Sequence, residues 1–393
     1  MLLRQATFKV SINFKAIMTN DEKRLPFVDR SIHQDFVFGE IKIKNELDLV
    51  QKKKSFPGKY CDKPFEHLEI TPGGDCILCC PAWLPNIIGN IYEDSILNIW
   101  NSEKANLIRQ TILDGSFSYC SNTLCPFLVN DSLPNLWFLK FPQPYLKKYP
   151  KNIVLGIDES CNLTCPSCRS TRVSYTSGDK YERKKAVFNK LINEFFSAPH
   201  NEDITLTLNS SGDLFGSKIT RDFMFNFDPT PWPNLKLNVM THGVLFTKKY
   251  WDRIHLWQDR INTFHISFDA ATEETYDKIR VGGDWTTLLE NCRLIYKKID
   301  QYKKLSIDFV IQDLNYKEIP AFIELINSEF PKANAMLQLV VDWGTWNDAS
   351  LKQRSVWKSD HPDYLEYKQI LEIVRTKIKN GEYKNVDLGN VGN

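Results

Sequence analysis

Between residues 152 and 341, short runs of β-branched and apolar residues alternate with longer amphipathic segments. This alternation predicts βα units on a parallel sheet, because each strand is followed by a segment long enough for a crossover helix. Six units of this kind predict an α/β fold, a partial (β/α)6 TIM-like barrel with its chemistry at the carboxyl ends of the strands. The six predicted strands are Ile153 to Ile157, Ile204 to Leu208, Leu235 to Met240, Asn262 to Ser267, Leu305 to Ile311 and Met336 to Val341.

The clearest helix lies between the first two strands, where Val187, Leu191 and Phe195 recur at helical spacing and Pro199 follows. A second helical pattern covers Tyr364 to Lys379. We therefore expect residues 150–345 to form the barrel and residues 346–393 to form a helical tail.

The part before the barrel has a different pattern, with a turn signal at Pro72-Gly73-Gly74 and a helical stretch from Ser95 to Leu113. We expect a smaller domain over residues 56–135, preceded by an extension of unknown role over residues 1–55. The link from Phe138 to Lys151 contains three prolines and little periodicity, so we place the domain boundary there.

Length and charge narrow the class of protein. The chain has 393 residues, of which 42% are apolar and 25% charged, enough for one large core and a smaller domain. Lys plus Arg number 50 against 48 Asp plus Glu, so nothing in the net charge of +2 favours a nucleic-acid partner. The first residues lack the apolar core of a signal peptide, and no apolar stretch is as long as a membrane span. We expect a soluble, cytoplasmic protein.

The cysteines are clustered. Nine of the ten fall in two groups, six between Cys61 and Cys125 and three at Cys161, Cys165 and Cys168. In a long chain without secretory features, such grouping indicates metal sites rather than disulfides.

The second group has the spacing C-x3-C-x2-C and follows the first predicted strand. Three thiolates leave one iron of a 4Fe-4S cluster without a protein ligand, and that iron can bind a chelating small molecule. A structural zinc site is the alternative, although zinc prefers four protein ligands. With Asn162, Leu163 and Pro166 in place, the motif resembles that of the radical S-adenosylmethionine (SAM) enzymes, in which the amine and carboxylate of SAM occupy the open iron.

This resemblance implies further SAM-binding residues after successive strands. They are Ser211, Gly212 and Asp213 in place of the common Gly-Gly-Glu, then Ser267 of a Ser-x-Asp motif, and Arg280 as the partner of the SAM carboxylate. Asp213 as a helix cap and Arg280 as a surface ion pair are the alternatives. His242 stands where the family commonly has Asn, and Ser167 replaces an aromatic residue that often flanks the adenine.

The first cysteine group resembles the SPASM or twitch accessory domain, which usually follows a radical SAM core but here precedes it. The resemblance rests on the spacing C-x12-G-x4-C from Cys61 to Cys79 and on the strings Gly89-Asn90-Ile91 and Ile99-Trp100-Asn101. It implies an auxiliary 4Fe-4S cluster, and we expect its ligands to be Cys61, Cys79, Cys120 and Cys125. Cys80 is the alternative to Cys79, and four thiolates also suit a structural zinc.

Several residues remain candidates for roles around the substrate. Cys292 lies on an apolar face of a predicted helix, which favours core packing over a role as catalytic hydrogen donor. Cys76, like Cys292, is expected to be a small buried residue, although Cys76 or Cys80 would suit a hydrogen donor if it faced the barrel mouth. The candidate pocket residues at the ends of the fifth and sixth strands are Asp308, Gln312, Asp342, Trp343 and Trp346.

The resemblance implies an enzyme that reductively cleaves SAM to a 5′-deoxyadenosyl radical and takes a hydrogen atom from a peptide or a small polyhydroxylated metabolite. Oxidation, epimerisation and crosslinking all remain open as outcomes. A flavodoxin or ferredoxin is the expected reducing partner. The alternative is a non-catalytic iron–sulfur electron carrier or redox sensor, which would need neither SAM nor Asp213 and Arg280.

Overall fold

The computed structural model describes residues 55–135, 149–208, 210–298, 304–341, 343 and 345–391. All of these residues belong to one compact unit of the chain. The predicted extension over residues 1–55 lies outside the described residues except for Ser55, and so does most of the predicted link from 138 to 151. Within the described ranges, no helix is both long enough and apolar enough to cross a membrane.

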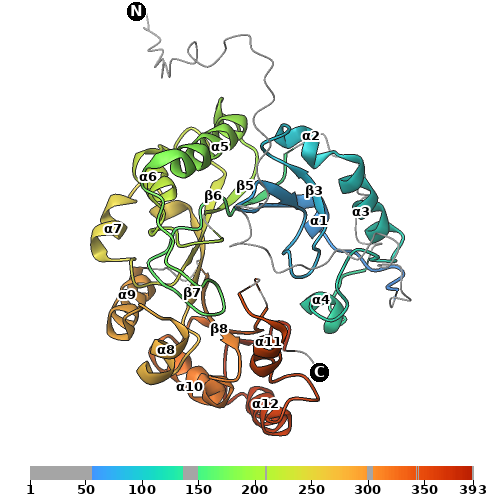
Figure 1. Ribbon diagram of the computed structural model, residues 1–393, viewed down its shortest axis with the longest axis vertical. Helices are drawn as coiled ribbons and strands as arrows, with labels where there is room; N and C mark the ends of the chain where they lie inside the picture. Colours follow the sequence, from blue (N-terminus) through green and yellow to red (C-terminus); the bar gives the residue numbers. More distant parts are fainter. Residues whose placement is uncertain are drawn as a thin grey trace, which may run out of the picture. The chain divides into compact units, whose positions relative to one another are not determined.

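The described strands form one sheet of ten, in the order β10-β9-β8-β7-β6-β5-β4-β1-β2-β3 (Figure 1). All six predicted strands are confirmed, with ends within two residues of the expected positions, and they pair in parallel from β4 through β9. They are β4 (Asn152–Leu155), β5 (Ile204–Leu208), β6 (Leu235–Thr241), β7 (Ile261–Ser267), β8 (Lys304–Ile311) and β9 (Asn334–Leu339). The predicted α/β half-barrel is therefore confirmed.

Helices cover the outer face of this sheet (Figure 1). Along β6 the residues Leu235, Leu237 and Val239 are buried, whereas the side chains between them are more exposed, as alternation in a strand requires. The covering elements are α5 (Gly178–Phe196), α6 (Lys218–Asn226), α7 (Lys248–Arg253), η5 (Gln258–Arg260), α8 (Glu273–Ile279), α9 (Trp285–Lys298), η6 (Tyr316–Glu318) and α10 (Ile319–Glu329). The alternate residues of each strand face the inner, concave side of the half-barrel.

The segment before the barrel extends the same sheet. It contains α1 (Lys63–Glu66), β1 (His67–Ile70), β2 (Asp75–Ile77), β3 (Ile87–Asn90), α2 (Ile96–Trp100), α3 (Glu103–Leu113) and α4 (Pro126–Val129). β2 pairs antiparallel with both β1 and β3, whereas β1 pairs in parallel with β4, from His67 opposite Asn152 to Ile70 opposite Leu155. The predicted domain boundaries stay a prediction, yet the sheet itself is continuous across the expected boundary.

The helical stretch expected from Ser95 to Leu113 is two helices. The hydroxyl of Ser95 accepts a hydrogen bond from the N–H of Asn98, and the hydroxyl of Ser102 accepts one from the N–H of Ala105. Each serine thus caps the start of its own helix, and the second cap interrupts the continuous helix that the apolar pattern predicts.

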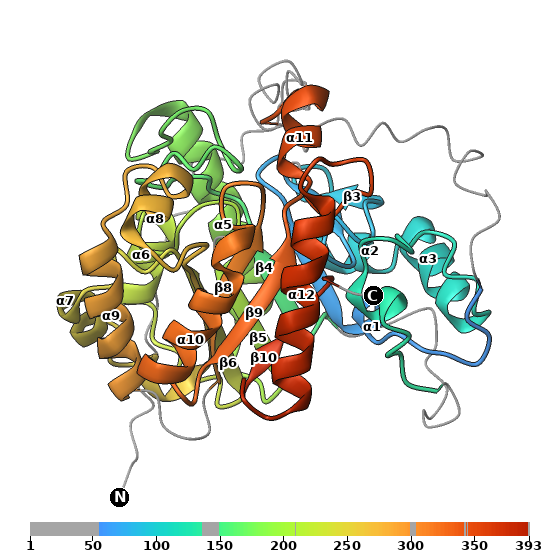
Figure 2. The ribbon, with the colours of Figure 1, turned by 90° about the horizontal axis from the view of Figure 1, so that it is seen from below.

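The tail holds α11 (Asp348–Arg354), α12 (Tyr364–Lys379) and β10 (Val386–Asp387). The predicted helix over Tyr364 to Lys379 is confirmed, whereas α11 and β10 were not expected. β10 pairs in parallel with β9 and ends the sheet at that edge. Arg375 of α12 donates a hydrogen bond to the carbonyl of Val391 just beyond β10, so helix and edge strand lie together (Figure 2).

Candidate cofactor and metal sites

The loop after β4 holds the three predicted cluster cysteines at the carboxyl end of the half-barrel. The N–H of Cys161 donates to the carbonyl of Val173 at 2.9 Å, and the N–H of Cys168 donates to the carbonyl of Cys165 at 2.8 Å. These bonds fold the loop back on itself. Cys161 and Cys165 are buried, and Cys168 packs against them. One short segment therefore gathers three free thiols.

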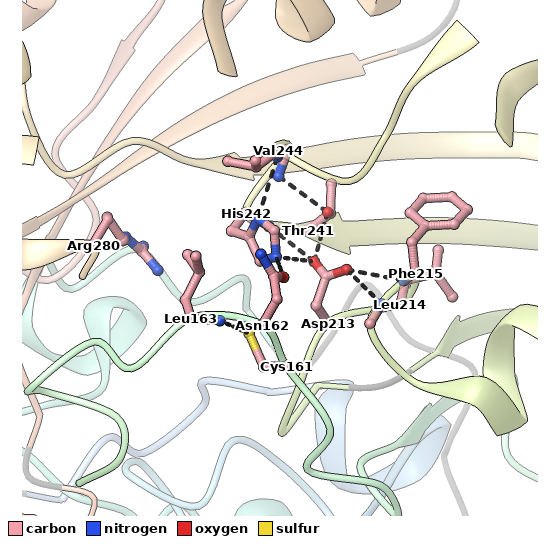
Figure 3. A network of polar contacts seen from close by, with 12 residues as sticks. Cys161, Asn162, Leu163, Asp213, Leu214, Phe215, Thr241, His242, Val244 and Arg280 are labelled. Carbon is pink, nitrogen blue, oxygen red and sulfur yellow. Dashed lines mark hydrogen bonds and ion pairs between the residues drawn. The ribbon is translucent and has the colours of Figure 1, made fainter. Parts of the chain in front are cut away.

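Each of these sulfurs accepts a hydrogen bond. The backbone N–H of Leu163 donates to Sγ of Cys161 over 3.4 Å (Figure 3). The other two donors are guanidinium groups: Arg169 contacts Sγ of Cys168 at 3.3 Å, and Arg280 contacts Sγ of Cys165 at 3.8 Å. Such donors stabilise negative charge on sulfur, which is the ligand form of cysteine.

Burial acts in the opposite direction to these donors. It raises the pKa of Cys161 to about 12 and also raises the pKa of Cys165, a rise that the charge of Arg280 counteracts. Thiolates at this depth therefore need positive charge close by. Iron supplies that charge when it binds, so the donor set fits an iron–sulfur cluster.

Asp213 is the centre of a buried network that joins the ends of β5 and β6 (Figure 3). Its Oδ1 accepts hydrogen bonds from the N–H groups of Phe215 at 2.9 Å and Gly216 at 3.0 Å. Its Oδ2 accepts from the hydroxyl of Thr241 at 2.6 Å and from the N–H of His242 at 3.1 Å. The N-cap of α6 is Ser217, so the alternative of Asp213 as a helix cap is wrong: Asp213 accepts from a turn that precedes the helix. Its predicted contact with the SAM amine stays a prediction.

His242, which replaces the family's usual Asn, links this network to the cysteine loop. Its Nδ1 accepts a hydrogen bond from the N–H of Val244 at 3.2 Å, so we assign the ring proton to Nε2. That nitrogen donates to Oδ1 of Asn162 at 2.7 Å and lies 3.5 Å from Oδ2 of Asp213. Burial lowers the pKa of His242, which agrees with a neutral imidazole.

Gly212 allows the segment after β5 to lie directly against the segment that leads into the cysteine loop. A Cβ atom at this position would lie 2.5 Å from the carbonyl oxygen of Ser160 and 2.8 Å from that of Asp158. Both neighbours are backbone atoms and have little freedom to move. Compared with the Gly-Gly-Glu motif, the string Ser211-Gly212-Asp213 therefore keeps the one glycine that the close approach needs.

Arg280 and Asp269 form a buried ion pair beside Cys165. The guanidinium Nη2 lies 2.6 Å from Oδ2 of Asp269, and the side chains are only 15% and 3% exposed. The ion pair of the alternative interpretation is therefore present, but it is buried and does not lie at the surface. Nε of Arg280 is buried without a hydrogen-bond partner among the described residues. A donor left over at this position fits a carboxylate of a bound cofactor.

The structure brings the predicted SAM residues together at one end of the barrel. Ser211, Gly212 and Asp213 follow β5, Ser267 ends β7, and Arg280 follows α8. The carbonyl of Ser211 accepts a hydrogen bond from Arg169 at 2.9 Å, and Ser267 is half-buried. Their contacts with SAM stay predictions.

The four predicted auxiliary ligands lie around one cavity. A pocket of about 360 Å³, partly open to solvent, is lined by Cys61, Cys79, Cys120 and Cys125 together with apolar side chains such as Trp83. Burial raises the pKa of Cys61 to about 12 and that of Cys79 well above its ordinary value, and the nearby thiols of the group add to the rise at Cys79. A cavity lined by four thiols fits the predicted auxiliary cluster.

The other two cysteines of this group do not line the cavity. Cys80 lies at the turn into Trp83, and burial, followed by the charge of Glu69, raises its pKa to about 12. Cys76 is fully buried, and its thiol donates to the carbonyl of Gly74. Among the described residues, no three or more His, Cys, Asp or Glu side chains are spaced to hold a single metal ion. Cys79 rather than Cys80 is the ligand that this geometry favours.

Residues 61–126 match the SPASM family, an iron–sulfur cluster-binding domain. The match begins at Cys61 and ends just past Cys125, so it contains the whole predicted auxiliary group. A three-thiol loop at the mouth of a (β/α)6 half-barrel accompanies it. The family match therefore covers the segment before the half-barrel. The matched segment precedes the half-barrel, as expected, and the predicted auxiliary cluster agrees with an iron–sulfur domain. SAM and the 4Fe-4S cluster of the cysteine loop stay predictions.

Solved structures share parts of this architecture at low identity. SuiB from Streptococcus suis is 12% identical with a TM-score of 0.40, over 61% of this chain and 48% of its own. The protein anSMEcpe with bound AdoMet is 12% identical with a TM-score of 0.40, over 60% of each chain. Methylornithine synthase (PylB) is 10% identical with a TM-score of 0.33, over 49% of this chain and 53% of its own. The chain thus spans about half of SuiB. No curated protein sequence matches it.

The inner wall of the half-barrel carries a cluster of polar side chains that the sequence only partly indicates. Nδ1 of His265 on β7 lies 3.3 Å from Oδ2 of Asp308 on β8, and Ser306 donates to Oδ1 of Asp308 at 2.7 Å. Burial lowers the pKa of His265, but the bond with Asp308 outweighs this and raises it. Asp308 was a candidate pocket residue, whereas His265 was missed. Its signal is the polar alternation of Thr263, His265 and Ser267 within β7.

The remaining candidates are placed as follows. Cys292 of α9 is fully buried in the hydrophobic core, which favours packing; its role as hydrogen donor stays a prediction. Gln312 is buried just beyond β8, and its N–H donates to Oδ1 of Asn315 at 2.8 Å. Trp343 and Trp346 are half-buried. Asp342 lies outside the described residues, and the part of the predicted pocket that depends on it is not tested.

Proposed function

We propose that this protein is an enzyme that cleaves SAM reductively at Cys161, Cys165 and Cys168 and takes a hydrogen atom from a polar substrate held on the inner wall of the half-barrel. The proposal rests above all on the three thiols at the barrel mouth, two of them buried and one half-buried, each with its own hydrogen-bond donor. When bound, the cluster and SAM supply a 5′-deoxyadenosyl radical by one-electron cleavage of the sulfonium.

The chain's own residues would position that chemistry. Arg280, fixed by Asp269, presents its remaining buried donor next to Cys165, where a SAM carboxylate on the open iron would lie. Asp213 and His242 hold the ends of β5 and β6 against the cysteine loop through Asn162. A rigid, buried mouth of this kind would exclude water from a radical, which loose hydrogen donors would otherwise quench.

The inner wall supports a substrate rich in hydroxyl or amide groups. The strand register places His265 opposite Ser306 and Ser267 opposite Asp308, so donors and acceptors alternate across neighbouring strands. On β6, Asn238 accepts a hydrogen bond from the hydroxyl of Thr263 at 2.8 Å. Such a wall suits a peptide or a polyhydroxylated metabolite better than an apolar ligand. Oxidation, epimerisation and crosslinking are all compatible with it.

Reducing equivalents would come from a small electron carrier such as a flavodoxin or a ferredoxin, and we place the protein in the cytoplasm. All ten cysteines are free thiols, and their grouping around two sites supports a reducing compartment, where thiols persist and clusters can assemble.

Anaerobic reconstitution of the full chain, followed by dithionite and SAM, tests this function. We expect 5′-deoxyadenosine to form and Cys161→Ala to abolish it. Cys292→Ala serves as the matched control, because it removes a buried cysteine far in sequence from the loop, and it should leave SAM cleavage intact. If the parent makes no 5′-deoxyadenosine and SAM leaves the cluster's electron paramagnetic resonance (EPR) spectrum unchanged, the protein is an electron carrier or sensor instead.

A further inference from the structure

Arg169 occupies a position that the proposed function does not yet use. It directly follows Cys168, and its side chain is buried, with 6% exposed. One guanidinium nitrogen, Nη1, donates to the carbonyl of Glu159. The other, Nη2, donates both to Sγ of Cys168 at 3.3 Å and to the carbonyl of Ser211 at 2.9 Å. A single planar group thus joins three segments: the end of the cysteine loop, the segment after β4 and the segment after β5.

The two arginines next to the cysteine loop differ in their surroundings. Arg280 contacts Cys165 at 3.8 Å and is paired with the carboxylate of Asp269. Arg169 lies closer to its sulfur, at 3.3 Å, and also donates to the carbonyls of Glu159 and Ser211. A charged N–H at this distance stabilises negative charge on the sulfur more strongly than a neutral donor does.

Hydrogen bonds to the ligand sulfurs and the net charge around an iron–sulfur cluster set its reduction potential. Reduction adds one negative charge, so a buried guanidinium bonded to a ligand sulfur favours the reduced cluster. Because the guanidinium of Arg169 is buried, solvent screens this interaction less than it would at the surface.

We propose that Arg169 is a positioning residue that raises the reduction potential of the cluster held by Cys161, Cys165 and Cys168 through its bond to Sγ of Cys168. The carbonyls of Glu159 and Ser211 hold the guanidinium in place for that bond. This inference rests on the proposed SAM-site cluster but adds a claim of its own, namely that the cluster's potential depends on one side chain next to its third ligand.

The test is a potentiometric titration, followed by EPR, of the full chain reconstituted under anaerobic conditions. The signal that shifts when SAM is added reports the cluster of the cysteine loop rather than the auxiliary one. For Arg169→Met we expect the equilibrium between reduced and oxidised cluster to move about tenfold toward oxidised, which is about 59 mV for one electron. Arg169→Lys keeps the positive charge but loses the planar guanidinium with its several N–H donors, so its shift in reduction potential should be smaller.

Arg172→Met is the matched control. Arg172 is an exposed arginine of the same loop, and its loss removes one positive charge without removing a bond to sulfur. Its potential should equal that of the parent. The inference is overturned if both Arg169 variants titrate like Arg172→Met, or if both lose the loop's iron while remaining folded by circular dichroism, since Arg169 would then serve assembly alone. A parent protein without any SAM-sensitive signal would instead refute the proposed function.

Discussion

Nε2 of His242 lies 2.7 Å from Oδ1 of Asn162, the residue next to Cys161, and this contact connects the end of β6 to the cysteine loop. Because Nδ1 of His242 accepts from Val244, the imidazole acts as a neutral bridge with a donor on one side and an acceptor on the other. The loop is therefore held by side-chain bonds as well as by its own turns.

Replacement of His242 by Ala should loosen this bridge. It leaves Oδ1 of the half-buried Asn162 without this donor, which costs about 1 kcal/mol of folding free energy. Denaturant unfolding measures the loss. His255→Ala is the control, because His255 is exposed and its removal should change little. In a double-mutant cycle with Asn162→Ala, simple additivity of the two losses would argue against the bridge.

The choice between Cys79 and Cys80 is open to a direct comparison. Cys79 lines the auxiliary cavity and Cys80 does not, so we expect Cys79→Ala to lose the auxiliary iron after reconstitution and Cys80→Ala to retain it. Iron and acid-labile sulfide per chain are the measurements, and sulfide also separates a cluster from zinc. Equal iron loss in both variants would contradict the assignment.

Substitution of Gly212 should affect SAM rather than the cluster. A Cβ atom there would lie 2.5 Å from the carbonyl oxygen of Ser160, so Gly212→Ala must displace the Ser211–Asp213 segment. We expect the three thiols to keep their iron, while the SAM-induced EPR change requires at least tenfold more SAM. At Gly216 the nearest atom would lie 3.2 Å away, so Gly216→Ala should be much milder. A normal SAM response in Gly212→Ala would rule out the crowding argument.

Glu69 gives a pH-dependent contribution to stability. Burial raises its pKa from 4.5 to about 7, although a hydrogen bond with Ser210 opposes the rise. The folded state therefore holds the proton more tightly than the unfolded chain, and stability is fully present below pH 4.5 and lost as the pH rises through 7. Glu69→Gln removes this loss, so its advantage over the parent should grow by about 1 kcal/mol between pH 6 and pH 8.5.

Unfolding free energies of the parent and Glu69→Gln at the two pH values measure this effect. Glu66→Gln is the control, because the carboxylate of Glu66 is more exposed and pairs with Lys151 at 2.6 Å. The difference between Glu66→Gln and the parent should stay constant over the same range. A constant difference for Glu69→Gln as well would show that Glu69 is ionised in the folded protein.

The strands and main helices could be predicted because their signals are local. In β6 and α12, alternation and helical periodicity appear within a few consecutive residues, and both elements lie within one residue of the expected positions. β10 was missed because two residues carry no pattern, and its pairing with β9 depends on a contact between distant parts of the chain. The pairing of β1 with β4 depends in the same way on a contact across more than eighty residues.

The ligand cysteines could be predicted because their spacing is itself the signal. The side chains that contact these cysteines could not be predicted. Arg169 follows Cys168 directly, but only the fold shows that it bonds to that sulfur and to Ser211. The bonds that surround the carboxylate of Asp213 come mainly from residues beyond β5 and β6, and no single-sequence pattern brings these together. His265 was missed because one histidine in an apolar strand indicates burial as readily as function.

The parallel ladder between β1 and β4 makes the SPASM segment inseparable from the barrel. If the chain were cut between β1 and β4, each half would expose a row of unpaired N–H and C=O groups, and such an edge promotes aggregation with other chains. Isolated fragments should therefore precipitate, and grafting this cysteine-rich module onto another half-barrel would require its hairpin to be grafted as well. Because β4 leads directly into the cysteine loop, we expect a displacement of the backbone at one cofactor site to shift the backbone at the other.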